Sequence, residues 1–142
     1  MKTYFLFGAF ALLAGACNAQ KLKDKDIPSP VKTSFQKNYA SATHVTWEKE
    51  NGNYEGNWGG KSGEDNSVMY SPAGVFIEYV KAIRVSELPK NTLMYLRTHY
   101  KNVKVTEAGK VTDAKGKICY EAEVNRKDVL FDSNGNFIQV EN

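Results

Sequence analysis

Few side chains in this 142-residue sequence have the types and spacing that catalysis requires. A catalytic base needs a nucleophile and an orienting group nearby, and neither His44 nor His99 belongs to such a pattern. Cys119 is expected to share a strand face with Glu121 and Glu123, whose carboxylates would raise the pKa of the thiol and disfavour the reactive thiolate. We therefore expect Cys119 to be packed in a strand, with an intermolecular disulfide as the alternative.

Two acidic patterns resemble known chemical sites. Glu121 and Glu123 would lie about 6.6 Å apart along one strand face, a separation found in glycosidase carboxylate pairs, although alternating glutamates usually lie on a solvated face. Asp132, Asn134 and Asn136 alternate like the start of a calcium loop, but the glycine is fourth instead of sixth and no acid follows at the twelfth position. We predict a hairpin turn there.

The segment Gly59-Gly60-Lys61-Ser62-Gly63 resembles part of a phosphate-binding loop. It lacks the full glycine spacing, and it is expected between antiparallel strands instead of opening a helix. The sequence therefore predicts a protein that is not an enzyme and that holds no cofactor and no metal.

Charge and aromatic content favour protein binding over other kinds of recognition. The 19 basic and 16 acidic residues give a net charge of +3, without the clustered basic face that nucleic acid requires. Tyrosine and tryptophan are enriched in binding hot spots, although aromatic residues also dominate core packing. The candidate partner-binding residues are Trp47, Tyr54, Trp58, Tyr70, Tyr79 and Tyr120.

The first nineteen residues have the pattern of a signal peptide. One charge at Lys2 precedes an apolar run over residues 5–16, which is too short for a transmembrane helix. We expect cleavage after Ala19 and export to the periplasm or the extracellular space. The alternative is a lipoprotein anchored through Cys17. Residues 20–26, which alternate in charge, are expected to form a flexible leader.

The rest of the chain contains an internal repeat with a spacing of 61 residues. The matched segments are Ile27-Pro28 with Leu88-Pro89, Phe35 with Leu96, Tyr39 with Tyr100, and Val68-Met69-Tyr70 with Val129-Leu130-Phe131. Several matches in the same order indicate a duplication. We therefore divide the chain into repeats at residues 27–85 and 86–142.

Each repeat is expected to form one helix followed by about four strands. The first helix should begin near Pro30 and end near Tyr39, and the second should begin near Pro89. Period-two alternation and the turn pairs Asn51-Gly52 and Asn134-Gly135 predict antiparallel hairpins. Because about 60 residues make a marginal core, we predict an α+β fold in which both repeats form one broad antiparallel sheet with the helices on one face.

The sequence resembles the PepSY-like family of secreted proteins, which is described as similar in fold to beta-lactamase inhibitory protein. The resemblance lies in the leader, the two repeats, and the segments Trp47…Gly52-Asn53-Tyr54-Glu55, Tyr120-Glu121-Ala122-Glu123 and Phe131-Asp132-Ser133-Asn134-Gly135. It implies a concave sheet backed by helices and a binding or inhibitory role, without catalytic residues. The first repeat departs from the pattern because Ser71 stands where Asp132 stands in the second.

These observations predict a secreted, non-enzymatic module that binds a protein partner through the open sheet face and the loop at residues 59–66. An inhibitor or regulator of a secreted enzyme such as a peptidase is one form of this function. The alternative is a periplasmic carrier of a small molecule or envelope ligand, with a pocket between the sheet and its helices. A third hypothesis is an enzyme that uses Glu121, Glu123 or Cys119.

Overall fold

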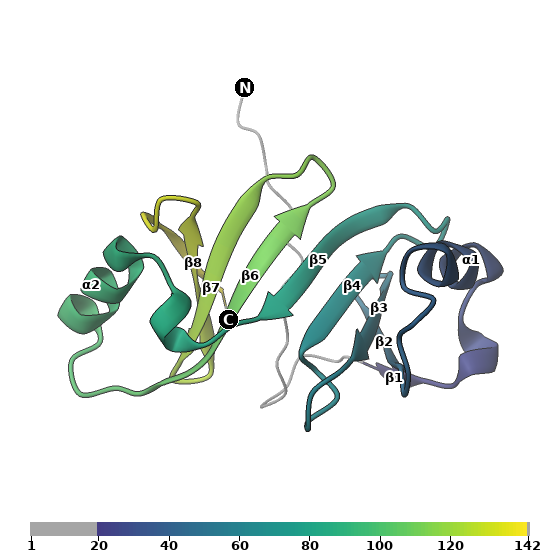
Figure 1. The fold of residues 1–142 in the computed structure, drawn as a ribbon, viewed down its shortest axis with the longest axis horizontal. Coiled ribbons are helices and arrows are strands. Elements are labelled where there is room, and N and C mark those ends of the chain that lie inside the picture. The colour runs from purple at the N-terminus through teal and green to yellow at the C-terminus, as the bar shows by residue number, and fades with distance from the viewer. Residues whose placement is uncertain (1–19, 142) are drawn as a thin grey trace.

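The computed structural model describes residues 20–141 and shows an antiparallel sheet of nine strands with two helices (Figure 1). The strands lie in the sheet in chain order, so that each one pairs with its neighbours in sequence. The strands are β1 (Gln20–Leu22), β2 (Thr46–Glu50), β3 (Asn53–Trp58), β4 (Asn66–Tyr70), β5 (Phe76–Ala82), β6 (Val105–Asp113), β7 (Ile118–Val124), β8 (Lys127–Asp132) and β9 (Phe137–Glu141). The helices are α1 (Ser29–Asn38) and α2 (Lys90–His99). The predicted fold class is confirmed.

The two repeats follow the same plan within this sheet. The first contains α1 and β2–β5, and the second contains α2 and β6–β9. The helix α1 lies beside the β1–β3 end of the sheet, and α2 lies beside the β7–β8 end (Figure 1). The pairing of β5 with β6 joins the two repeats into a single sheet.

The part of the chain N-terminal to the first repeat differs from the expectation. Residues 20–26 were expected to be a flexible leader, but Gln20–Leu22 forms β1, antiparallel to β2, and Asp24–Asp26 forms a short 3-10 turn. Leu22 lies opposite Trp47 and packs on the first-repeat core, where Ile27 is buried. Leu22 and Ile27 therefore anchor the charged segment between them, residues 23–26, to the first-repeat core. The expected signal peptide and both of its processing alternatives lie outside the described residues.

Both helices dock through an apolar stripe. Val31 and Phe35 are the buried residues of α1, and Thr92 and Leu96 are those of α2. Each helix has ten residues and would be marginal alone, so the packing of this stripe stabilises it. Within residues 20–141, neither helix has the length and apolar character needed to cross a membrane.

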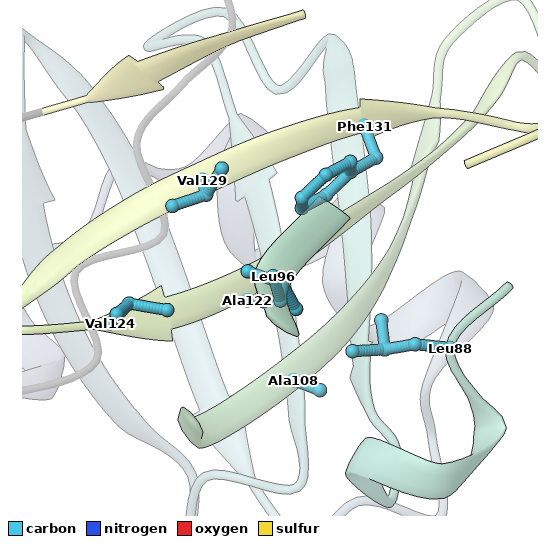
Figure 2. Packing of buried hydrophobic residues seen from close by; sticks show 7 residues of the cluster. All are labelled: Leu88, Leu96, Ala108, Ala122, Val124, Val129 and Phe131. Atoms are coloured by element: carbon cyan, nitrogen blue, oxygen red, sulfur yellow. The ribbon is translucent and has the colours of Figure 1, made fainter. Parts of the chain in front are cut away.

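Two of the hydrophobic clusters in the core are related to each other by the repeat. Five pairs of buried residues, one member from each cluster, are separated by 61 positions: Ile27 and Leu88, Phe35 and Leu96, Trp47 and Ala108, Val68 and Val129, and Tyr70 and Phe131. In the second repeat, Leu96 of α2 lies over Ala122, with Val129 and Phe131 on the neighbouring strand (Figure 2). The duplication therefore extends from sequence to packing.

A tight turn of the same kind precedes the last strand of each repeat, and the helix of that repeat packs on it. Gly74 and Gly135 have φ of +76° and +81°, which favours glycine. Ser34 of α1 donates a hydrogen bond to the carbonyl of Gly74, and Asn91 of α2 donates to the carbonyl of Asn134. Close packing of the helix on the turn thus fixes the angle at which each helix lies on the sheet.

Candidate functional site

Strand register divides the sheet into a helix-covered face and an acidic face. Trp47 opposes Gly56, Gly56 opposes Val68 and Val68 opposes Tyr79, so these residues lie on the face that α1 covers. The residues that alternate with them point the other way. We call this side the acidic face and define it by seven of its carboxylates: Glu48, Glu50, Glu55, Glu78, Glu121, Asp128 and Glu141.

The acidic face draws on both repeats. Glu48 opposes Glu55 across β2 and β3, and Asp128 opposes both Glu123 and Glu141 across β7, β8 and β9. Like charges directly opposite each other on a sheet are destabilising. This arrangement therefore costs stability, which points to a role other than holding the fold together.

Five of these carboxylates are buried, each 6% or less exposed: Glu48, Glu50, Glu55, Glu78 and Glu121. Glutamate is almost never fully buried unless it is paired. Glu55 accepts a short hydrogen bond from the Ser67 hydroxyl. By contrast, both carboxylate oxygens of Glu50 and the Oε1 atom of Glu121 have no hydrogen-bond partner among residues 20–141.

The position of Glu121 depends on Gly109, its partner across the β6–β7 ladder. A Cβ atom added at Gly109 would lie 2.5 Å from Glu121 Oε1. The absence of a side chain on β6 is therefore what allows the Glu121 carboxylate to lie against the sheet.

Burial and mutual repulsion raise the pKa values of these carboxyl groups toward neutral pH. Burial, followed by the charges of nearby carboxylates, raises the pKa of Glu50 to about 7 and that of Glu78 to about 8. Burial also raises the pKa of Glu55 and of Asp128 to about 7, and it raises that of Glu121 strongly. The face as a whole therefore gains negative charge near neutral pH.

The electrostatic coupling crosses from one repeat to the other. Asp128 and Glu141 of the second repeat contribute to the raised pKa of Glu50 in the first. Glu55 of the first repeat contributes in the same way to that of Glu121. The two groups of carboxylates therefore act as one charged surface.

A small apolar cluster lies among the carboxylates. Val80 opposes Val111, which opposes Cys119, and all three residues are buried. Burial raises the pKa of the Cys119 thiol above its ordinary value, with nearby carboxylates adding to the effect. This environment disfavours the thiolate, so Cys119 is built as a packing residue.

The six aromatic residues proposed for partner binding lie on the helix-covered face. Trp47 and Tyr70 are buried, while Tyr54, Trp58, Tyr79 and Tyr120 are half-buried. Five of them pack in the cluster under α1, and Tyr120 packs on the second-repeat cluster. The structure gives these rings a packing role, and partner binding by the half-buried ones stays a prediction.

The rings under α1 are close enough to stabilise each other. The Phe35 ring lies edge-on to Trp47 at 5.2 Å and to Trp58 at 5.3 Å between centroids. Tyr79 stacks on Tyr39 at 5.9 Å and donates a hydrogen bond of 2.6 Å to Asn66 Oδ1. Such aromatic pairs contribute about 0.5–1.5 kcal/mol beyond their buried area.

The other candidate residues have local structural roles. Asp132 Oδ1 accepts hydrogen bonds from the backbone N–H groups of Asn134 and Asn136, which is the predicted hairpin turn. Within residues 20–141, no group of three His, Cys, Asp or Glu side chains is arranged to hold a metal ion. His99 ends α2, where its ring stacks on Tyr95.

A hollow lies beside the helix in each repeat, on the side away from the acidic face. The first, of about 810 Å³, is lined by residues that include Phe35, Ala42 and Trp47. The second, of about 290 Å³, is lined by residues that include Leu96 and Val103, which lie 61 positions after Phe35 and Ala42. The hollows are therefore products of the repeat, and the first is the larger.

Comparison with known proteins gives a consistent family and fold. A family described as "Putative beta-lactamase-inhibitor-like, PepSY-like" matches the sequence twice, over residues 14–78 and 61–139. The first match covers most of the first repeat, and the second match covers most of the second repeat. No curated protein matches the sequence.

Solved structures from Bacteroides have the same fold. A "putative periplasmic" protein from Bacteroides eggerthii is 16% identical, with a TM-score of 0.70, over 81% of this chain and 88% of that one. A BLIP-like protein from Bacteroides fragilis is 17% identical, with a TM-score of 0.62, over 80% of this chain and 85% of that one. At this identity the similarity establishes the fold alone.

Proposed function

Because this chain belongs to the beta-lactamase-inhibitor-like, PepSY-like family, we propose that it is an exported, non-enzymatic module that binds a protein partner through the acidic face. The observation that carries the proposal is the set of carboxylates that both repeats place on the sheet face away from the helices. The proposed mechanism is occlusion, in which this face lies against a surface of the partner.

Export to the periplasm is part of the proposal. The charged start and apolar run of residues 1–19 support it, as does the description of a similar structure as a periplasmic protein. An inhibitor or regulator of a secreted enzyme is the form of binding that the family description favours.

Site-specific photo-cross-linking tests the binding face. A photoreactive residue at Thr46 or at Gln139 would sit at an exposed position on the same side as the carboxylates, one in each repeat. The matched control is Met94, which is 63% exposed on α2. We expect both sheet positions, and not Met94, to capture the same protein from periplasmic extract. Equal capture from all three positions would contradict the proposed face.

The hollow under α1 favours a second candidate, a carrier of an apolar ligand. Phe35 and Trp47 line it, and a volume of about 810 Å³ is within the range of ligand pockets. Ala42→Phe would fill part of the hollow and should reduce the change that a fatty acid causes in tryptophan fluorescence. If wild-type fluorescence does not respond to the fatty acid, this candidate is wrong for that ligand class.

A further inference from the structure

The unpartnered carboxylate oxygens indicate what the acidic face binds. Glu50 is 4% exposed, and neither of its carboxylate oxygens has a hydrogen-bond partner in the part of the chain that the structure describes. Two free oxygens on one carboxylate match the paired N–H donors of a guanidinium group, which binds carboxylates in bidentate geometry. Glu121, also 4% exposed, offers its single unpartnered atom Oε1 to one further donor.

The surroundings of these two residues suit a cation on a long apolar stem. Val80, Val111 and Cys119 form a buried apolar cluster on the same face. Because Glu50 and Glu121 are recessed among buried residues, a donor must come on a long side chain. The methylene groups of lysine and arginine allow the charged head to reach such a partner.

The charge of the face decides among classes of ligand. Seven carboxylates repel nucleic acid and other anions. A bound metal ion would need converging ligands, and the described residues contain no group of three acidic, histidine or cysteine side chains so arranged. A protein segment can instead bring several cations, spaced along its chain, to carboxylates that belong to different strands.

We propose that the acidic face binds an arginine-containing segment of the partner protein, with a guanidinium group paired to Glu50 and a second basic group to Glu121. This inference rests on the proposed function and specifies the chemistry of the partner. It makes the charge of the buried carboxylates the source of both affinity and selectivity.

A peptide in which arginine alternates with valine is the probe. Fluorescence anisotropy with the purified protein would measure its affinity near pH 8, against a control peptide with citrulline in place of arginine. We expect the arginine peptide to bind, with an affinity that falls as salt rises, and the citrulline peptide to bind at least about tenfold more weakly. Equal binding of the two peptides would overturn the proposal.

Protein variants locate the contact. Glu50→Gln combined with Glu121→Gln should weaken arginine-peptide binding by about tenfold or more. The matched control is Asp24→Asn combined with Asp26→Asn, which removes the same charge from exposed positions in the 3-10 turn. Circular dichroism would verify that both variants are folded. Equal loss in the two double variants would mean attraction by net charge alone, and the proposed site would be wrong.

A measurement on the unmodified protein keeps the test independent of folding. Binding of the arginine peptide should strengthen from about pH 6 to about pH 8, because the carboxylates of the face lose protons over this range. The charged groups that act on Glu50 and Glu121 are Glu48, Glu55, Glu78, Asp128 and Glu141. Lys21 of β1 lies on the same face, opposite Glu48. Affinity that does not change with pH would contradict pairing with these groups.

The remaining outcomes separate this inference from the proposed function. If calcium ions bind stoichiometrically and displace the peptide, the face is an inorganic cation site and the inference is wrong. If cross-linking at Thr46 and Gln139 captures a partner whose binding is unchanged by the Glu50 and Glu121 substitutions, the proposed function stands and the inference falls. If the peptide binds as expected but no partner is captured from the face, the proposed function fails.

Discussion

At the scale of single residues, the acidic face is defined by carboxylates that fold into an unfavourable environment. Glu78 is 5% exposed, and burial together with the charges of Glu55, Glu141 and Glu50 raises its pKa to about 8 from an ordinary value of 4.5. Between about pH 4.5 and pH 8, the folded protein therefore keeps a proton on Glu78, whereas the unfolded chain has released it. Stability from this residue is fully present below the lower value and is lost as the pH rises through the higher one.

Glu78→Gln should therefore stabilise the protein at pH 8 and have little effect at pH 5. Glutamine has a similar shape and no charge, so the substitution removes the cost of ionising a buried group. We expect a gain of roughly 1–3 kcal/mol in the free energy of unfolding at pH 8, measured by urea denaturation at both values. A loss of stability at pH 8 would show that the ionised carboxylate is compensated in the fold.

The sequence predicts which residues lie on this face, but not that their carboxylates are buried. Glu48, Glu50 and Glu55 alternate with Trp47 and Tyr54 along β2 and β3, so their placement on opposite faces is predictable from period two. The degree of burial was not predictable, because alternating glutamates normally lie in solvent. Choosing the aromatic residues as binding groups therefore selected the face that the helices cover.

At the scale of elements, the repeated turn under each helix is a structural requirement of the fold. A Cβ atom at Gly135 would lie 2.8 Å from Pro89 Cβ and 2.9 Å from the backbone nitrogen of Thr92, at the start of α2. A Cβ at Gly74 would lie 2.4 Å from the carbonyl oxygen of Pro30 in α1. A side chain at either position would move the helix.

Gly135→Ala should destabilise the protein by about 2–4 kcal/mol, the sum of a positive φ and a steric clash. Gly116→Ala is the matched control, because Gly116 ends the Asp113 turn with φ of +77° and nothing within 4 Å of an added Cβ. It should cost only about 1 kcal/mol, from the backbone conformation alone. Equal losses of melting temperature in the two variants would show that helix packing does not depend on the glycine.

Both helices and the hairpin turns were predictable because their signals are local. Proline at the helix start and glycine in the turns act through the conformation of one or two residues. The first-repeat turn differs only in detail, since Ser71 Oγ accepts a hydrogen bond from the Val75 N–H as Asp132 accepts one from Asn136. The strand β1 was missed because it has three residues and forms through its pairing with β2, which is a tertiary contact.

At the scale of the whole molecule, two cores are joined into one cooperative unit. Each repeat has its own cluster under its own helix, and the β5–β6 ladder connects them. The cluster of Val80, Val111 and Cys119 lies at this junction, with Val80 from the first repeat and the other two from the second. Of the three apolar clusters within residues 20–141, it is the one whose buried members come from both repeats.

Val80→Ala combined with Val111→Ala should therefore weaken the coupling between the repeats as well as their stability. We expect a loss of about 2–4 kcal/mol from the lost burial and the cavity, and a separation of the two unfolding transitions. Both tryptophans, Trp47 and Trp58, belong to the first repeat, so their fluorescence reports that repeat, whereas far-ultraviolet circular dichroism reports both. In urea the two signals should coincide for the wild type and diverge for this variant. Val68→Ala, a buried change confined to the first-repeat cluster, should lower stability while the two signals stay together. Coincident transitions in the junction variant would show that the β5–β6 ladder and the packing of Ile83 and Val85 on the second-repeat cluster couple the repeats without these valines.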